Sequence, residues 1–243
     1  MRPVLRSTSP QEQEFEPYTK SLSYLVSRLG SYCSYCERHV QTNLAVEHIQ
    51  PKALPRYEHL RGTWTNFLLG CVNCNSTKLN KDVVFEQLFL PDRDNTALAF
   101  DYLQDGSVVP SEYAKSMGHE SLCRATLKLT GLDKIPASTT DENDKLVALE
   151  RVSQRMQTWL LALDMFALIE NNDTHELRSA ITQLAYKSGF FSIWMKVFLN
   201  DRDMRLRLVE VYPGTRESGC FDNDGIPLTP HPNDDQLPDG GKI

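Results

Sequence analysis

The sequence predicts an α+β protein that is mainly helical, with a cysteine-bearing element near its start and a helical region after it. Two Cys-x-x-Cys pairs lie close together, and the stretch between them suits two short strands followed by a helix. From about residue 111 to residue 212, apolar residues recur every three or four positions, as is typical of helices. We therefore divide the chain into a first domain, 1–91, a hairpin and helical domain, 92–212, and an acidic tail rich in proline and glycine, 213–243.

The first domain begins with an expected helix from Pro17 to Leu29, where apolar side chains fall at spacings of three and four. The run from Leu44 to Ile49 suits a short strand, and a second apolar run follows Asn66. Residues Asn75 to Lys78 are then expected to open a helix. The first helix is expected to pack on this strand, strand, helix unit.

The two cysteine pairs predict a structural zinc site. Thiolates three residues apart can turn onto one cation, and two such pairs make a closed tetrahedral site. The predicted Zn²⁺ ligands are Cys33, Cys36, Cys71 and Cys74. The gap between the pairs is longer than in a common zinc ribbon, so a folded insert is expected between them. The alternative is four buried free thiols or two disulfides, and the isolated Cys123 and Cys220 are expected to be ordinary cysteines.

The second domain opens with a hairpin signal. Asp105 and Gly106 stand between two apolar runs, 97–102 and 107–109, and an Asp-Gly pair in that setting favours a tight β-turn. One helix is then expected over Ser111–Leu129, closed by a glycine.

Three more helices are expected. The first covers Asp141–Asn171, the second begins near Asp173 and ends at Lys187, and the third covers Phe190–Val211. Asp173 with Glu176 resembles a capping box that opens the second of them. The longest helix is predicted to carry a broad apolar face. That face consists of Leu146, Leu149, Val152, Met156, Trp159, Leu160, Leu163 and Ala167.

The charge balance argues against strong nucleic-acid binding by the chain alone. The net charge is −6, with +2 in residues 1–91 and −8 in residues 92–243. Non-specific DNA affinity comes largely from neutralised phosphates. We therefore expect any DNA contact in the first domain, and a partner that supplies part of the binding surface. The tail is expected to be loop or disordered.

Other function classes are excluded by what the sequence lacks. No apolar run approaches the ~20 residues that a membrane span requires. The first residues lack the apolar core of a secretory signal, and thiolate ligands suit a reducing compartment, so a cytoplasmic location is expected. There is no phosphate-binding glycine loop, so the chain is not expected to be a P-loop ATPase itself.

Residues 30–80 resemble the ββα-metal (HNH) nuclease motif. The cysteine pairs, an acid-His-Ile run, an Asn-x-Leu-Leu element and a Cys-Asn-x-x-Lys element follow one another in the order of that family. The resemblance implies that His48 is the general base and that Glu47 and Asn75 hold a catalytic divalent ion. It further implies that Asn66 braces the loop between the strands, and that the four paired cysteines hold the structural zinc.

The chemistry of phosphodiester cleavage agrees with these residue types. Histidine titrates near neutral pH, and a cation offsets charge at the attacked phosphate. One carboxylate and one amide oxygen suit a hard ion, so Mg²⁺ or Mn²⁺ is expected rather than zinc in the catalytic site. The alternative for His48 is a histidine in the core of a strand. Lys52 and Lys78 are candidates for contact with substrate phosphates, or else ordinary solvated lysines.

Softer motifs extend the resemblance over most of the chain. With a late Gly-Phe-Phe-Ser-Ile-Trp-Met run from residue 189, the chain is similar to the PtuB family of HNH nuclease subunits from the Septu antiphage defence system and to its retron-associated relatives. This implies a DNA substrate, a role in antiphage defence, and a hetero-oligomer with a PtuA-like ATPase subunit. We expect the partner to dock on the helical domain and tail, because these regions lack site chemistry and carry the excess charge. The alternatives are a stand-alone HNH nuclease and a catalytically inactive, zinc-stabilised module that binds nucleic acid or protein.

Overall fold

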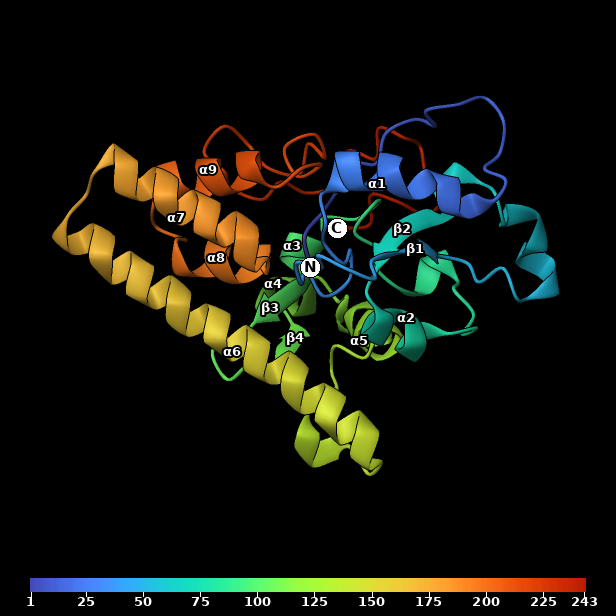
Figure 1. The fold of residues 1–243 in the computed structure, drawn as a ribbon, viewed down its shortest axis with the longest axis horizontal. Coiled ribbons are helices and arrows are strands. Elements are labelled where there is room, and N and C mark those ends of the chain that lie inside the picture. The colour runs from blue at the N-terminus through green and yellow to red at the C-terminus, as the bar shows by residue number, and fades with distance from the viewer.

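The first domain is built on one antiparallel β-hairpin flanked by helices. In the computed structural model, which describes residues 1–243 except for the side chain of Ser138, the elements are η1 (Tyr18–Ser21), α1 (Leu22–Leu29), β1 (Ala45–His48), β2 (Phe67–Gly70) and α2 (Val72–Lys78). The predicted helix and both strands are therefore confirmed within a few residues. Figure 1 shows α1 above the two strands and α2 below them.

The two strands pair so that His48 lies opposite Phe67 and Glu47 lies opposite Leu68. All of β2 is buried, because α1 covers the hairpin on one side and residues 83–132 on the other. The connection between the strands carries two short 3₁₀ turns, η2 (Pro55–Leu60) and η3 (Trp64–Asn66). The hairpin thus holds the predicted base at the very end of a buried strand.

Helix α2 begins earlier than expected, at Val72 rather than Asn75. The chain leaves β2 in an extended conformation, and Cys71, with ψ 161°, serves as the N-cap residue. The helix ends at Lys78 because Leu79 takes a positive φ of 46°. Asn75 therefore lies in the middle of a short helix.

A second, smaller hairpin follows and packs beside α5. The elements here are η4 (Phe85–Gln87), α3 (Thr96–Ala99), β3 (Phe100–Tyr102), β4 (Val108–Pro110), α4 (Glu112–Ser116) and α5 (Glu120–Thr130). The predicted hairpin is confirmed, although its first strand is shortened by the helical turn α3. The single helix expected over 111–129 is wrong, because Gly118 takes a φ of +77° and separates α4 from α5.

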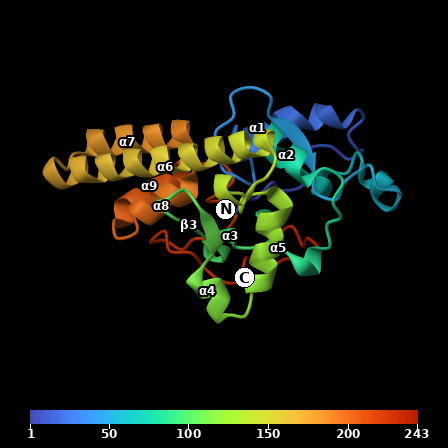
Figure 2. The same cartoon turned by 90° about the horizontal axis from the view of Figure 1, so that it is seen from below.

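The remaining helices form an elongated lobe (Figure 2). They are η5 (Pro136–Ser138), α6 (Glu142–Asn171), α7 (His175–Ser188), α8 (Phe191–Val197) and α9 (Arg202–Val211). The long helix is confirmed, whereas the expected helix over 190–211 is two helices. The cap of α7 is Thr174, whose hydroxyl accepts from the amide of Leu177, and not Asp173, whose carboxylate pairs with Arg178.

Two hydrophobic clusters hold the chain together. The first unites the first hairpin, the second hairpin and α5, and it also includes Phe190, Ile193 and Ile243. The second joins α6, α7, α8 and α9 with the start of the tail. The core does not separate at residues 91–92, so the domain division drawn there stays a prediction.

The tail follows the loop alternative and not the disordered one. Residues 213–243 carry no helix or strand in the described structure, yet several of their side chains are buried, among them Cys220 and Phe221. The side-chain amide of Asn95 donates through Nδ2 to the backbone carbonyls of Cys220 and Leu228, at 3.0 and 2.6 Å. These contacts tie the tail to the centre of the molecule.

The long helix α6 turns six of the eight residues of its predicted apolar face outward, while Val152 and Trp159 are half-buried. Its fully buried side chains are Ala148, Arg151, Arg155, Thr158, Ala162 and Ile169, and Leu161, Met165 and Phe166 pack beside them on the second cluster. Its exposed apolar side chains are Leu146, Leu149, Met156, Leu160, Leu163 and Leu168. Despite its length, α6 is not a membrane span: none of the helices in the described part of the chain is both long and apolar enough to cross a bilayer.

Candidate metal centre and active-site cleft

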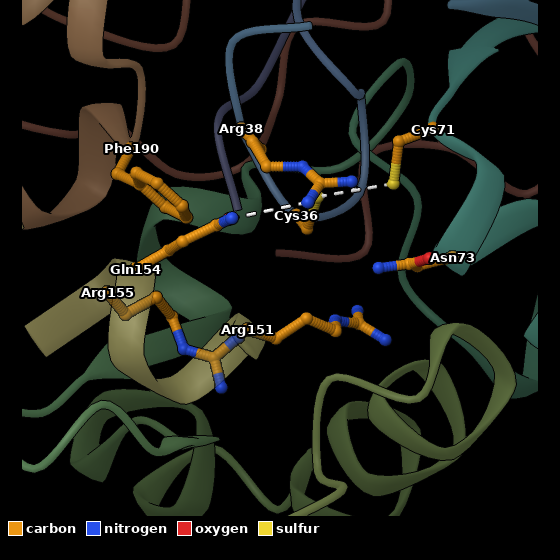
Figure 3. A pocket seen from close by; sticks show the side chains of 8 residues that line it. All are labelled: Cys36, Arg38, Cys71, Asn73, Arg151, Gln154, Arg155 and Phe190. Atoms are coloured by element: carbon orange, nitrogen blue, oxygen red, sulfur yellow. Dashed lines mark hydrogen bonds between the residues drawn. The ribbon is translucent and has the colours of Figure 1, made fainter. Parts of the chain in front are cut away.

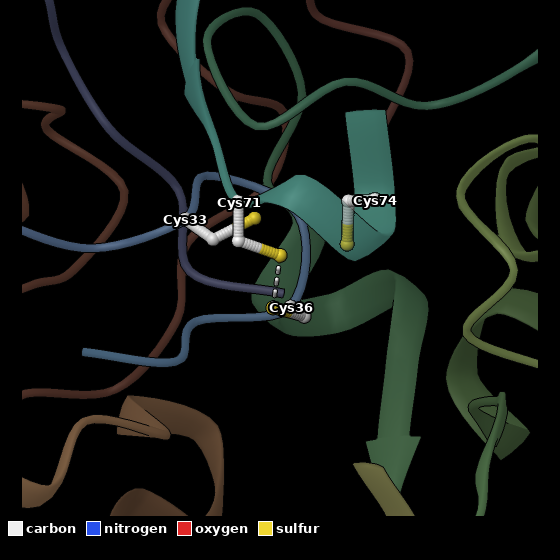
Figure 4. A group of neighbouring side chains, drawn as sticks. All are labelled: Cys33, Cys36, Cys71 and Cys74. Atoms are coloured by element: carbon white, nitrogen blue, oxygen red, sulfur yellow. Dashed lines mark hydrogen bonds between the residues drawn. The ribbon is translucent and has the colours of Figure 1, made fainter. Parts of the chain in front are cut away.

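Four cysteine side chains meet at one point in the first domain (Figure 4). Their sulfur atoms all lie within 4.8 Å of one another, and all four residues are buried. The sulfurs of Cys36 and Cys71 are 3.7 Å apart. A tetrahedral metal with bonds to sulfur of about 2.3 Å requires sulfur–sulfur edges of about 3.8 Å, whereas a disulfide requires about 2.05 Å. The arrangement therefore fits one metal ion and not two disulfides.

Short backbone contacts shape both cysteine turns. In the first, the amide of Glu37 donates to the carbonyl of Cys33, and the amide of Cys33 donates to the carbonyl of Arg38. The second is the start of α2, where Cys71 is the N-cap and Cys74 lies in the first turn. A spacing of three residues turns both thiols of each pair toward the same side.

The first cysteine turn docks against the junction of α7 and α8. The amide of Phe190 donates to the carbonyl of Glu37 at 3.0 Å. Gly189 has a φ of +76°, and a Cβ added there would come within 2.7 Å of the same carbonyl oxygen. Only glycine allows this close approach, so the late Gly-Phe motif has a structural reason: it seats the helical lobe on the metal centre.

Basic side chains surround the sulfurs (Figure 3). The buried guanidinium of Arg151, from α6, donates through Nη2 to the sulfur of Cys74 and to the carbonyl of Thr130, both at 3.3 Å. Arg38 lines the same pocket. Four thiolates and one Zn²⁺ carry a net charge of −2, which two guanidinium groups balance. The all-sulfur donor set, the edge length and these buried cations fit a structural zinc ion.

A cleft of ≈ 390 Å³ opens on the other side of the hairpin, between η1, the start of α1, β1 and α2. Five of the residues that the sequence analysis singled out line it: Glu47, His48, Lys52, Asn75 and Lys78. The structure thus brings together side chains from a strand, from the loop after it, and from a helix that begins at the cysteine centre.

The ring of His48 is fixed from three directions. Its Nε2 lies 3.0 Å from the carbonyl oxygen of Arg61, which can only accept, so Nε2 carries the proton and Nδ1 is the nitrogen that can take one up. Tyr18 and Phe67 contact the ring edge to face, with centroids 4.7 and 5.2 Å away. Burial lowers the pKa of His48 to about 4, so the imidazole is neutral at physiological pH.

Glu47 and Lys78 form a buried ion pair. The Lys78 ammonium lies 2.8 Å from Glu47 Oε1 and donates to the carbonyl of His48 at 2.7 Å. Burial raises the pKa of Glu47, and the neighbouring ammonium opposes that rise. The pair leaves the second oxygen of the carboxylate for another partner. It also means that a phosphate would meet Lys78 only by displacing Glu47.

The two asparagines differ in what they contact. Asn66 exchanges hydrogen bonds with the backbone of Gln50: its Oδ1 accepts from the amide at 2.8 Å and its Nδ2 donates to the carbonyl at 3.0 Å. These bonds pin the loop that follows β1 to the start of β2. Asn75 lies half-buried on α2 and lines the cleft, and its side-chain amide is of the oxygen-donor type that hard cations bind.

Sequence reasoning missed two residues of the site. Tyr18 falls within the expected helix Pro17–Leu29, yet its ring contacts His48, and the Lys52 ammonium lies over it, 3.6 Å from the ring centroid. Arg61 contributes through its backbone carbonyl, which orients the histidine. A backbone contact leaves no signal in residue type, and one aromatic residue in an amphipathic helix has an adequate role in packing.

The comparison with protein families decides what this arrangement is. Residues 33–81 match the HNH endonuclease family. The matched stretch contains both cysteine pairs and every residue named above as a candidate for the cleft, except Tyr18. Among curated proteins, nothing matches the chain.

This HNH domain supports a nuclease function, and it implies a nucleic-acid substrate. Within the matched stretch, the cysteine cluster includes the first turn of α2, and the hairpin positions His48 in the cleft that α2 also lines. The rest of the chain lies outside the match.

Proposed function

We propose that the chain is a metal-dependent HNH endonuclease that hydrolyses DNA phosphodiesters. The observation that carries the proposal is the orientation of His48 in a cleft that also contains Glu47 and Asn75. The Arg61 carbonyl engages Nε2, so Nδ1 of a neutral ring is left to accept a proton. That is what a general base requires in order to deprotonate a neutral water molecule.

In the proposed reaction, Nδ1 of His48 takes a proton from a water molecule as its oxygen attacks phosphorus. The bond from phosphorus to the leaving oxygen breaks, and that oxygen takes a proton from solvent. A bound Mg²⁺ or Mn²⁺ supplies the positive charge that offsets the developing charge on the phosphate. Oε2 of Glu47 and the amide oxygen of Asn75 would hold the ion. Lys78 keeps the carboxylate oriented, and Lys52, at the rim, would contact a phosphate.

We propose further that the chain works in the cytoplasm as the nuclease subunit of a PtuB-like antiphage system, in a hetero-oligomer with a PtuA-like ATPase. The net charge of −6 supports a need for a partner, since such a chain gains little affinity from phosphate neutralisation. The softer sequence motifs around residue 189 support the family. They correspond to the contact that seats the helical lobe on the metal centre.

The test is cleavage by the zinc-loaded chain of supercoiled plasmid and of single-stranded RNA, with Mg²⁺ or Mn²⁺ added or omitted. Each reaction is run with and without a PtuA-like ATPase and ATP. We expect plasmid cleavage that requires the added ion and increases with the ATPase. Cleavage of RNA alone would contradict the DNA assignment, and full activity without the partner would contradict the hetero-oligomer.

One observation favours a second candidate, an inactive zinc-stabilised binding module. Lys78 occupies one oxygen of Glu47, the carboxylate that would hold the ion. If the positive charge of Lys78 also keeps a cation away from the second oxygen of Glu47, added Mn²⁺ will not bind in the cleft. Electron paramagnetic resonance of Mn²⁺ with the zinc-loaded chain separates the two: one bound ion per chain supports the nuclease, and no bound ion supports the module.

A further inference from the structure

The outer face of α6 carries a regular apolar stripe. Its members are Leu146, Leu149, Met156, Leu160, Leu163 and Ala167, with Ser153 in the gap. The spacings alternate between three and four residues, so the side chains form one row about 32 Å long. Leu146 is 65% exposed and Leu160 is 58% exposed. We refer to this row as the α6 stripe.

The stripe is not the side by which α6 packs on its own chain. The inward side is formed by residues such as Arg151, Arg155 and Ala162, each 5% exposed or less. Figures 1 and 2 show α6 along the outside of the lobe, with α7 and α8 on its inner side. Continuous apolar patches are rare on the surface of monomeric proteins, and where they occur they mark interaction sites. An alternation of three and four residues is the pattern that packs against another helix.

The charges beside the stripe are almost all negative. The acidic residues that α6 exposes are Glu142, Asp144, Glu150, Asp164 and Glu170. The exposed base on the helix is Lys145, which already pairs with Glu142 at 2.7 Å. The two arginines of α6 point inward. Cations of other elements reach two of these carboxylates, since Arg38 lies 3.4 Å from Glu150 and Lys134 lies 2.9 Å from Asp144. Among the described residues, the unpaired negative charge of α6 is therefore that of Asp164 and Glu170. One flank of the stripe is therefore a row of acidic and amide side chains.

This charge decides which occupant fits. A second copy packed antiparallel would set Glu150 of one chain against Asp164 of the other, because the two positions are symmetric about residue 157. A second copy packed in parallel would also place an excess of acidic side chains along the pair of helices, and the base on α6 that could offset them is Lys145. Like charges beside a helix seam destabilise pairing. A bilayer surface with anionic lipids is disfavoured for the same reason.

We propose that the α6 stripe binds an amphipathic helix of another protein, one with an apolar seam flanked by lysine or arginine. The partner's seam would cover the leucines, and its basic flank would pair with Asp164 and also with Glu150, whose present contact is a partly exposed one to Arg38 at 3.4 Å. The inference rests on the surface alone and does not depend on nuclease activity. Its test reads binding, so its failure is distinct from a failure of cleavage.

The experiment uses the full, zinc-loaded chain and two labelled synthetic helical peptides of 28 residues. Both have leucine at the seam positions, one with lysine and the other with glutamate on the flanks. Fluorescence anisotropy should give saturable binding of the lysine-flanked peptide, weakened by salt, with at least tenfold lower affinity for the glutamate-flanked one. The double variant Leu149→Gln with Leu160→Gln should bind the lysine-flanked peptide with at least tenfold lower affinity than the wild type. Leu103→Gln, an exposed leucine in the small hairpin, should change the affinity less than twofold.

A charge swap sharpens the test. The double variant Gln157→Lys with Asp164→Lys should lower the affinity for the lysine-flanked peptide at least tenfold and raise the affinity for the glutamate-flanked one. Equal binding of the lysine-flanked peptide to the leucine variant would overturn the proposal, because attraction of charge alone would then explain it. So would no binding at all, binding to phosphatidylcholine vesicles, or a dimer in analytical ultracentrifugation that Leu160→Gln dissolves.

Discussion

The HNH domain and helix α6 differ in the burial of the residues that their sequence patterns identify. In residues 33–81, the polar side chains singled out by spacing are buried and paired: Glu47 with Lys78, and His48 with a carbonyl. In α6, six of the eight apolar side chains singled out by periodicity are exposed, and Arg151 and Arg155 lie inside. A motif whose geometry is set by ligands or hydrogen bonds thus specifies its own surroundings. Helical periodicity specifies only a face.

The arginines explain why α6 can reverse its faces. Burying a guanidinium is costly unless it is paired. Arg151 reaches the sulfur of Cys74 and the carbonyl of Thr130, and Arg155 Nε reaches the carbonyl of Gly106. The inner face of α6 is thus anchored to the metal centre and to the small hairpin by these polar contacts, in addition to its apolar contacts with the second cluster. The leucines at 146, 149, 160 and 163 are left for solvent or for a partner.

The largest effect should come from removing a zinc ligand. Cys71→Ser should release the metal and unfold the HNH domain, because a structural zinc site contributes on the order of 10 kcal/mol of binding free energy. Elemental analysis and calorimetric unfolding measure both. Cys123→Ala, a buried cysteine outside the cluster, should keep one zinc per chain. A Cys71→Ser protein that unfolds like the wild type would remove the basis of the comparison.

A smaller effect should come from the arginine that links the two regions. Arg151→Met should destabilise the chain by about 1.5–3 kcal/mol, the range for a hydrogen bond to a charged group, and should speed the transfer of zinc to a chelator. The matched control is Arg124→Met on α5, whose guanidinium makes an exposed pair with Glu120 and should contribute less than about 0.5 kcal/mol. Denaturant unfolding and chelator kinetics check both. Equal effects of the two variants would mean that α6 is not anchored through Arg151.

The two faces of α6 can be compared directly at neighbouring positions. Ala162 is fully buried, so Ala162→Leu should overfill the interface and cost about 1–3 kcal/mol. Leu160→Gln on the outer face should change the unfolding free energy by less than about 0.5 kcal/mol. Thermal unfolding of the two variants measures the contrast. If Leu160→Gln were the more destabilising, the assignment of inner and outer faces would be reversed.

The smallest expected effect is that of pH on His48. Its pKa of about 4 lies below the ordinary value of about 6.5, so the ring stays neutral, and able to accept a proton, as the pH falls from 8 to 6. The cleavage rate should change by less than about twofold over that range and should fall below pH 5. Because the pKa of His48 is lower in the folded chain than in the unfolded one, the unfolded chain binds the proton first as the pH falls. The free energy of unfolding is therefore not reduced by His48 above about pH 6.5, and it decreases between that pH and about pH 4. A rate that halves near pH 6.5 would show an exposed, ordinary histidine.

The sequence determined the first domain more fully than the second. The spacing of Cys33, Cys36, Cys71 and Cys74 was sufficient for the cluster, because ligands at i and i+3 must turn to one side. It did not reveal the pairing of Lys78 with Glu47, because a lysine at the end of an amphipathic helix is usually solvated. The contact of Arg61 with His48 uses a backbone oxygen, which no residue type records.

In the helical lobe, helix positions were predictable and breaks were not. Gly118 divides the expected helix 111–129 because its positive φ is incompatible with a continuous helix, whereas glycine alone is tolerated inside many helices. Which face of α6 packs on the core depends on the contacts of Arg151 with Cys74 and Thr130, which lie 77 and 21 residues away in the sequence. Local periodicity carries no information about such contacts.

The most direct test of the account is the single-turnover rate of plasmid cleavage by zinc-loaded wild type, His48→Ala and His59→Ala with Mg²⁺. His59 lies exposed in the same interstrand loop and serves as the matched control. The account predicts that His48→Ala keeps its zinc and its melting temperature and loses at least about 100-fold in rate, while His59→Ala cleaves within about twofold of wild type. Wild-type cleavage by His48→Ala, with the zinc centre intact, would contradict the assignment of the base and with it the site.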